Sequence, residues 1–476
     1  MQNRSNPTAE KIRSRLDHPV IDSDGHLVEY LPLVQDFVRE LAGPEVEAGF
    51  TRNVDRMLGW KKMTPEQRRD LGFVRPAFWA LPCQNTLDRA TAMLPRLLHQ
   101  RLDELGIDFA VLYPTYGLIP ANLANDEVRR AGCRAFNRYC AELYGEFSAR
   151  LAPVAAIPMH TPGEAVEELE YCVRELGLKV VMLPNFIQRP LPAAGDVDRP
   201  PLWMDTYGPD SPHDYDPVWA KCVELGVSPT FHSGGFGWGS RASSHSYVYN
   251  HIGSFASAGD AICRSMFING IVARFPELRC AFLEGGVAWG ANLYSDILGH
   301  WEKRNADHIQ HYNPANLDRE RLRELFESYA PDSLNQRYDR IEYALQTLSN
   351  PDEPLDTVDE FERCRIERAE QIGEVFETNF YFGCEADDPS NAAAFDTRRN
   401  PHGIRLNAIF SSDIGHWDVP DMRHVLEEAH ELVDRGLFSE QDFRDFVFAN
   451  PVKLWIGSNP DFFAGTAVED SVPKAL

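Results

Sequence analysis

The stretch HPVIDSDGH at residues 18–26 decides the fold, because an apolar run in it closes on the polar side chains Asp22, Asp24 and His26. Seven further stretches have the same form, opening apolar and closing on polar or glycine residues. They are DFAVLYPT (108–115), APVAAIPM (152–159), KVVMLPN (179–185), SPTFHSGG (228–235), RCAFLEGG (279–286), NFYFGCE (379–385) and AIFSSDIGHWD (408–418). Near-continuous apolar runs are typical of parallel strands that helices cover on the outside.

Helical segments separate these expected strands. The clearest begins at Thr161, where a capping residue, Pro162 and Glu164 precede a helical pattern that ends at Gly177. Eight strands alternating with helices predict an α/β fold of the (β/α)8 TIM-barrel class. We expect one elaborated barrel over 1–476.

Two intervals, 27–107 and 287–378, are too long for simple connections between a strand and a helix. Both carry helical patterns of their own, so we expect them to be insertions. The first is rich in aromatic residues and the second is charged and helical, and we expect both to cap the barrel mouth. Either one could instead form an oligomer contact, and we expect a homo-oligomer, most simply a dimer.

Charge and hydropathy exclude several classes of protein. The chain has 72 acidic and 47 basic residues, which gives a net charge of −25. This charge disfavours binding to nucleic acid or to an anionic membrane surface. No run approaches the roughly 18 apolar residues of a membrane span, and the N-terminus lacks a signal-peptide core. We therefore expect a cytoplasmic protein whose partner is a small-molecule substrate.

The C-terminal ends of barrel strands meet on one face, where active sites of this fold lie. Potential metal ligands occur there in four of the expected strands. They are Asp24 and His26 in the first, His232 in the fifth, Glu284 in the sixth and Asp413 in the eighth. Taken alone, the Asp-x-His pair is more typical of an Asx turn beside a surface histidine, and a lone histidine is often a core residue. Together, at matching strand ends, these residues predict a metal site.

Other residues near these strand ends are candidates for contact with substrate. Arg241 could bind a carboxylate, and Trp238 and Trp289 could form an apolar wall, although core packing explains a single tryptophan equally well. His251 follows the fifth strand on a loop and is a candidate catalytic residue, or it faces solvent. His416 lies just beyond Asp413 and is a candidate for substrate binding.

The sequence also resembles the amidohydrolase-related family that includes aminocarboxymuconate-semialdehyde decarboxylase, the resorcylate-type decarboxylases and some hydrolases. The resemblance rests on DSDGH, FHSGG, RFPELRCAFLEGG, SSDIGHWD and FANPVKLW, which span most of the chain. It implies a (β/α)8 barrel and a divalent metal held by Asp24, His26, His232 and Asp413. The decarboxylases usually carry a histidine where this chain has Glu284.

The carboxylate of Glu284 differs from an imidazole in charge and basicity, which weakens the expectation of decarboxylation. Glu284 could be a general base, a metal ligand or a bridge between two ions. Carboxylates combined with imidazoles suit zinc, iron and manganese. We expect zinc first, with iron or manganese as alternatives, and one or two ions.

Four functions remain open at this point. The leading hypothesis is hydrolysis of a small carbonyl or carboxylate substrate, aromatic or cyclic, in which Glu284 or Asp413 takes a proton from a metal-activated water. The second is non-oxidative, metal-dependent decarboxylation. The third is a non-heme di-iron oxygenase, and the fourth is a barrel that binds a ligand without turnover.

Overall fold

In the computed structural model, eight parallel strands form one sheet in the order β1-β2-β3-β4-β7-β8-β9-β10. The structure describes residues 9–195, 201–232 and 241–473. The strands are β1 (Ile21–Leu27), β2 (Phe109–Pro114), β3 (Leu151–Ala156), β4 (Val180–Pro184), β7 (Pro229–His232), β8 (Cys280–Phe282), β9 (Phe380–Glu385) and β10 (Asn407–Ser411). All eight lie within, or within one residue of, the stretches expected to form strands.

Backbone hydrogen bonds join the first and last strands at their C-terminal ends. The amide of Asp413 donates to the carbonyl of Asp24, and the amide of His26 donates to the carbonyl of Ile414, both at 3.0 Å. The sheet therefore closes, and the predicted (β/α)8 barrel is confirmed.

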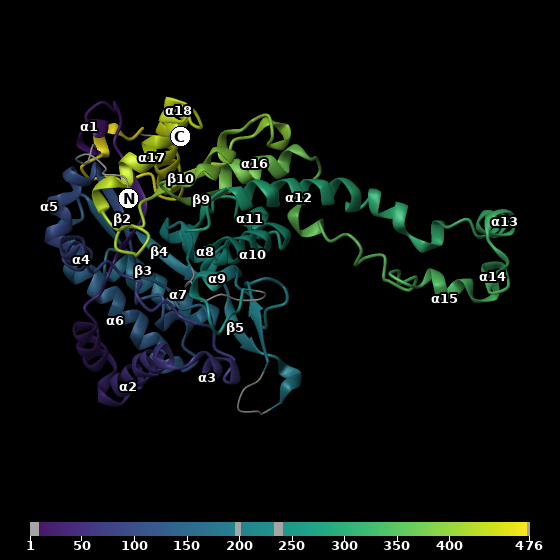
Figure 1. Cartoon of the computed structure of the whole chain (residues 1–476), viewed down its shortest axis with the longest axis horizontal. Coiled ribbons are helices and arrows are strands. Elements are labelled where there is room, and N and C mark those ends of the chain that lie inside the picture. The colour runs from purple at the N-terminus through teal and green to yellow at the C-terminus, as the bar shows by residue number, and fades with distance from the viewer. Residues whose placement is uncertain (1–8, 196–200, 233–240, 474–476) are drawn as a thin grey trace.

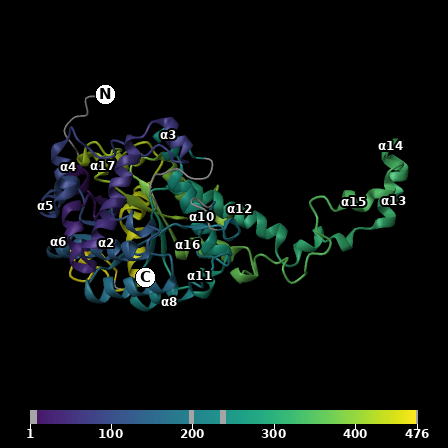
Figure 2. The ribbon, with the colours of Figure 1, turned by 90° about the horizontal axis from the view of Figure 1, so that it is seen from below.

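Helices surround the barrel (Figures 1 and 2). Those that follow strands or complete the wall are α1 (Ala9–Arg13), α6 (Asp126–Tyr144), α7 (Pro162–Glu170), α8 (Asp216–Leu225), α9 (Tyr247–His251), α10 (Ser254–Ile268), α11 (Ile271–Arg274), α16 (Glu370–Asn379), α17 (Val425–Asp434), α18 (Glu440–Arg444) and α19 (Asn450–Ser458). The predicted capping box precedes α7, where Thr161 Oγ1 accepts from the amide of Glu164 and Glu164 Oε1 accepts from the amide of Thr161. An added antiparallel pair, β5 (Ile187–Pro190) and β6 (Leu202–Asp205), follows β4.

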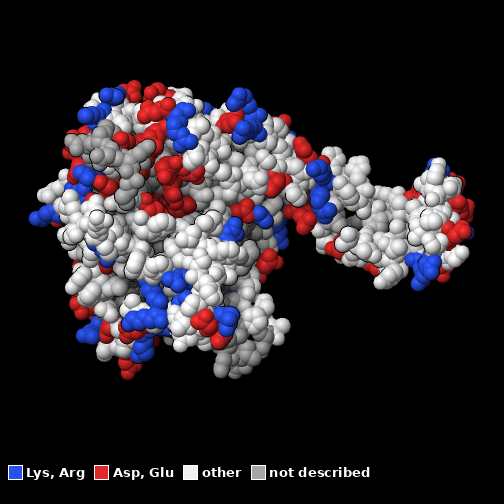
Figure 3. All heavy atoms as spheres, viewed as in Figure 1, with Lys and Arg blue, Asp and Glu red and all other residues white. Residues whose placement is uncertain are grey.

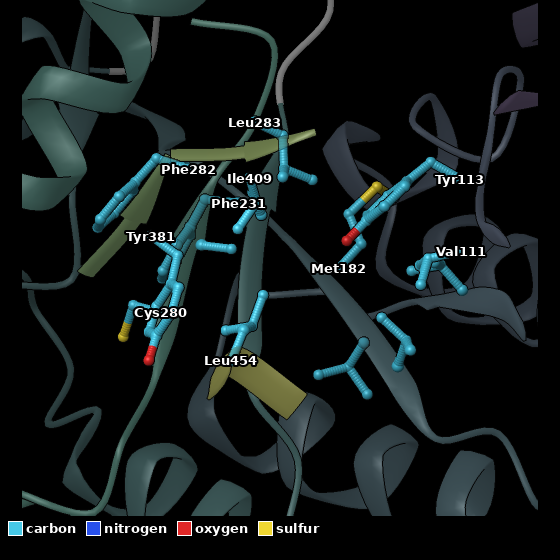
Figure 4. Packing of buried hydrophobic residues seen from close by; sticks show 14 of the residues in the cluster. Val111, Tyr113, Met182, Phe231, Cys280, Phe282, Leu283, Tyr381, Ile409 and Leu454 are labelled. Carbon is cyan, nitrogen blue, oxygen red and sulfur yellow. The ribbon is translucent and has the colours of Figure 1, made fainter. Parts of the chain in front are cut away.

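Buried apolar side chains fill the barrel (Figure 4). Val111 and Met182 lie inside the barrel with Tyr113, and Leu454 of α19 lies near the N-terminal ends of the strands, where its carbonyl accepts from Ser228 Oγ. Between the strands and the outer helices, Phe231 of β7 stacks on Phe282 of β8 with ring centroids 5.6 Å apart. A packed interior leaves only the C-terminal strand ends free to carry chemistry.

Four helices occupy the interval between β1 and β2. They are α2 (Leu31–Lys62), α3 (Pro65–Asp70), α4 (Thr86–Met93) and α5 (Pro95–Leu105). Helix α2 is kinked at Gly43, which adopts a left-handed φ of 84° before Pro44. Residues from its last turns and from 76–80 lie over the barrel mouth.

The interval between β8 and β9 begins with α12 (Ala288–Arg304), after which the chain leaves the barrel. The segment 310–360, which we call the arm, contains α13 (Arg319–Tyr329), α14 (Asp332–Asn335) and α15 (Ile341–Leu345). It projects away from the barrel in both views (Figures 1 and 2). The structure describes every residue of the arm, and none of them is buried.

The described surface carries both signs of charge. On the face shown in Figure 3, acidic and basic side chains are interspersed, and both occur at the tip of the arm. Within the described residues, no helix combines the length and the apolar character that a membrane crossing requires.

Candidate metal centre in the barrel mouth

The strand ends bring five expected ligands together. His26 Nε2 lies 3.2 Å from Glu284 Oε1, 3.4 Å from Asp413 Oδ1 and 3.6 Å from Asp24 Oδ1. His232 Nε2 lies 3.3 Å from the same Glu284 oxygen. Two overlapping groups, each with ligand atoms within 4.8 Å of one another, are Asp24 with His26 and His232, and His26 with Glu284, Asp413 and His416. The clustering expected from the sequence is present, centred on His26.

The conformation of β1 sets the first two ligands. Asp22 is fully buried and accepts hydrogen bonds from Ser412 Oγ at 2.6 Å and from the amides of Ser412 and Asp24. Its carboxylate therefore ties β1 to the loop after β10 and is not turned to the centre. The strand has an irregularity between Asp22 and Gly25, where a Cβ on Gly25 would lie 2.6 Å from Asp22 Oδ2. Asp24 and His26 thus owe their placement to a tight packing that requires glycine between them.

The two carboxylates from later strands sit on left-handed backbone. Glu284 has a φ of 57° and Asp413 a φ of 49°, a region that costs non-glycine residues about 1 kcal/mol or more. This conformation ends β8 at Phe282, two residues before Glu284, so the strand is shorter than the stretch 279–286 suggested. The strained turns direct both carboxylates toward His26.

Burial and neighbouring charges shift the pKa values of the ligands. Burial, followed by the proximity of His416, lowers the pKa of His26 to about 3, so this imidazole is neutral at physiological pH. Burial and the charges of Glu284 and Asp413 raise the pKa of Asp24 well above its usual range. Burial opposes ionisation of Glu284 too, but His232 and His26 hold its pKa well below normal. A neutral imidazole is the form that binds a metal.

The donor set fits a divalent cation. Both carboxylate oxygens of Asp24 and Glu284 Oε2 are buried without a hydrogen-bond partner among the described residues. Buried carboxylates are costly unless they are paired, hydrogen-bonded or coordinated to metal. The site therefore has the unmet negative charge and the mixed oxygen and nitrogen donors that a divalent metal requires.

A second layer of ionisable groups borders the ligands. His416 Nδ1 lies 2.7 Å from Asp413 Oδ1, and His416 Nε2 lies 3.3 Å from Thr115 Oγ1. Burial and nearby carboxylates raise the pKa of Glu385 to about 8 and that of Asp418 to about 9. Both acids are therefore mainly protonated at neutral pH while no cation is bound.

These groups lie on the floor of a cavity at the barrel mouth, whose empty space is about 1000 Å³ when the solvent at its open end is included. Its upper wall includes Met57, Ala77 and Leu118, supplied by the first insertion and by the loop after β2. His251 lines it and packs against Phe255 with ring centroids 5.1 Å apart.

The structure places two expected substrate contacts away from the lining of the cavity. Trp289 packs on Phe382 and is not among the residues that line the cavity. Arg241 also lies off the lining and donates to the carbonyl of Ile252. Trp238 falls outside the described residues. His416 and His251 do line the cavity, as expected.

The sequence pattern does not predict the places of Glu29, Lys61 and Asp418 around this cavity. Asp418 closes the SSDIGHWD motif, so its position two residues after His416 was a usable signal. Glu29 and Lys61 belong to the first insertion, and only the tertiary structure brings that segment to the mouth.

Residues 21–334 match the model of a family described as Amidohydrolase. An amidohydrolase from Mycobacterium avium subsp. paratuberculosis K-10 is similar in structure, with 18% identity over 92% of this chain and 100% of that one, and a TM-score of 0.49. A dihydroxybenzoic acid decarboxylase from Polaromonas sp. JS666, with bound manganese, has 16% identity over 92% and 97% and a TM-score of 0.47. A 4-oxalomesaconate hydratase from Rhodopseudomonas palustris has 12% identity over 95% and 98% and a TM-score of 0.45.

Proposed function

The chain belongs to the amidohydrolase family, and from this premise we propose that it is a metal-dependent hydrolase acting on a carbonyl group of a small, largely apolar substrate, aromatic or cyclic in its body. The observation that carries the proposal is the pairing of Asp413 with His416 at 2.7 Å beside the ligand cluster. A carboxylate and an imidazole in contact can accept and pass on a proton at the cavity floor.

Asp24, His26 and His232 would hold the metal, with Asp413 and Glu284 as further ligands. A divalent cation bound there would polarise the substrate carbonyl and acidify water. Two imidazoles with one carboxylate are a ligand set of catalytic zinc sites, so zinc is the ion that we propose. The same set suits iron and manganese, which makes direct metal analysis the deciding measurement.

Side chains at the cavity floor accept and transfer the proton that the attacking water releases. Asp413 receives the proton of the attacking water, and its hydrogen bond to His416 Nδ1 fixes the orientation of both groups. Thr115 Oγ1, at 3.3 Å from His416 Nε2, orients the imidazole from its other side. Burial lowers the pKa of His251, so this residue is a neutral base that can pick up the proton and return it to the leaving group.

The test uses p-nitrophenyl esters of short alkanoic acids and protein purified without chelator. Asp413→Asn is expected to lower kcat at least a hundredfold while the metal content stays at that of the native protein. Asp421→Asn, which removes a carboxylate paired with Arg423 outside the cavity, serves as the control. Unchanged ester hydrolysis in Asp413→Asn would refute the role of this residue. Asp24→Asn is expected to lose metal while remaining folded.

Non-oxidative decarboxylation is a second candidate, favoured by Glu385 and Asp418. Because the pKa values of these acids are raised to about 8 and about 9, either could deliver a proton to a substrate carbon. Release of carbon dioxide from an aromatic carboxylate, without incorporation of ¹⁸O from labelled water, would establish this reaction in place of hydrolysis.

A di-iron oxygenase is a third candidate, favoured by Glu284. Its Oε1 faces His26 and His232, while its Oε2 has no hydrogen-bond partner among the described residues. A carboxylate with one oxygen on each side can bridge two ions. Two irons per chain together with substrate-dependent oxygen consumption would support this function over the other two.

We also propose that the protein is a homodimer in which the arm contacts a second copy. Large apolar side chains are exposed along it. They are Tyr312, Tyr329, Leu334, Tyr343, Leu348 and Leu355. Short helices without a buried face are marginal in water, so packing against a partner would stabilise the arm.

A further inference from the structure

One lysine lies at the rim of the cavity. Among the described residues that line it, Lys61 is the only lysine or arginine. It lies in the last turn of α2, one helical turn after Met57, which lines the same wall. The floor, by contrast, presents the carboxylates of Glu284, Glu385, Asp413 and Asp418.

Lys61 has no counter-ion within the described structure. The residue is exposed at the rim of the cavity, and its amine makes no ion pair or hydrogen bond with any described residue. Burial of part of its side chain lowers the pKa of the amine, and no neighbouring carboxylate opposes that shift. An exposed ammonium group that has no carboxylate partner is available to pair with an anion that enters the cavity.

Much of the remaining lining of the cavity is apolar. It includes Pro76, Ala77, Leu118, Ile119 and Phe255. Such a wall suits a hydrocarbon body, because burying apolar surface is the main source of affinity for small molecules in pockets of this kind.

Charge then fixes the direction in which a ligand lies. Even with one divalent cation bound, the ionised carboxylates of Asp24, Glu284 and Asp413 leave the floor with a net negative charge, whereas Lys61 attracts an anionic group. From these placements we infer that the substrate is an amphipathic carboxylate. Its reacting carbonyl group lies at the metal centre, and its apolar body follows the wall of the cavity. Its carboxylate pairs with Lys61. This inference rests on the proposed function for the identity of the reacting group, and on the cavity alone for the anion site.

The test compares two fluorescent probes, 11-(dansylamino)undecanoic acid and its neutral methyl ester, by titration into the native protein loaded with zinc. The acid is expected to bind about fivefold more tightly than the ester. Lys61→Met should remove this preference, and Lys61→Arg should retain it. Lys62→Met, at the adjacent exposed lysine that does not line the cavity, should leave it unchanged.

Equal binding of acid and ester by the native protein would overturn the inference, as would an unchanged preference in Lys61→Met. The same titration with protein stripped of metal separates this inference from the proposed function. If the preference for the acid depends on Lys61 but no ester hydrolysis is found, the anion site stands and the hydrolytic function fails.

Discussion

Replacing Glu29 by glutamine tests how the structure holds the loop at residues 115–119. Glu29 is 2% exposed, and its two oxygens accept the amides of Tyr116 and Gly117, each at 2.9 Å. Thr115, Tyr116, Leu118 and Ile119 of this loop line the cavity. The carboxylate of one buried residue thus links the end of β1 to the wall of the site.

The expected magnitude follows from the pKa of this carboxyl. Burial raises it from 4.5 to about 7, a difference of about 2.5 units, which corresponds to about 3 kcal/mol at 1.36 kcal/mol per unit. Because the folded pKa is the higher one, the folded state binds more protons between pH 4.5 and 7. Native stability therefore falls as pH rises through that window. Glutamine does not titrate, so the stability of Glu29→Gln relative to the native protein should rise by up to about 3 kcal/mol between pH 4.5 and pH 8. Because the glutamine NH2 group cannot accept the second backbone amide, the variant should be less stable than the native protein at pH 4.5.

The assay is urea denaturation of the metal-loaded native protein and variant at several pH values between 4.5 and 8. Only the difference between the two proteins reports on Glu29, since other groups titrate in both. Glu45→Gln, an exposed glutamate on α2, is the control and should give a flat difference. A difference between variant and native protein that does not change between pH 4.5 and pH 8 would refute the reasoning, because Glu29 would then not titrate with a raised pKa in the folded state.

Three further predictions follow from the same structure. Removing the metal with a chelator should lower the melting temperature more at pH 9 than at pH 6. The raised pKa values of Glu385 and Asp418 make the metal-free protein lose stability as pH rises to about 9. An equal loss of melting temperature at both pH values, measured by calorimetry, would contradict this. Gly25→Ala should destabilise the fold by about 2 kcal/mol and weaken metal binding, since the new Cβ would press on Asp22; native metal affinity by isothermal titration would contradict it. Replacing 310–360 with a short Gly-Ser linker should give a monomer that keeps its metal, measured by light scattering and metal analysis, whereas a persisting dimer would exclude the arm as the contact.

Much of the fold could be predicted from the sequence, because each barrel strand is a buried run that ends on the same face. The same regularity predicts that Asp24, His26, His232 and Asp413 meet at one end of the barrel. It failed for Arg241 and for Trp289, which follow strand ends in sequence but pack elsewhere.

The remaining parts of the site depend on tertiary contacts that no local pattern encodes. Lys61 reaches the mouth only because α2, kinked at Gly43, folds back over the barrel. The sequence around Glu29 does not distinguish it from an ordinary exposed glutamate. Its burial depends on Tyr116 and Gly117, which lie far along the chain. The positions of side chains on the insertions cannot be predicted from the register of a strand, because the insertions lie outside the barrel strands.

The left-handed backbone at Glu284 and Asp413 bears on how such a site evolves. Glycine or asparagine would occupy these two turns at lower conformational cost. A lineage that no longer needed the reaction would thus gain stability by mutating the very residues that made it reactive. Retaining a glutamate and an aspartate at these positions requires continuous selection for function, so the loss of activity would be easy to reach and hard to reverse.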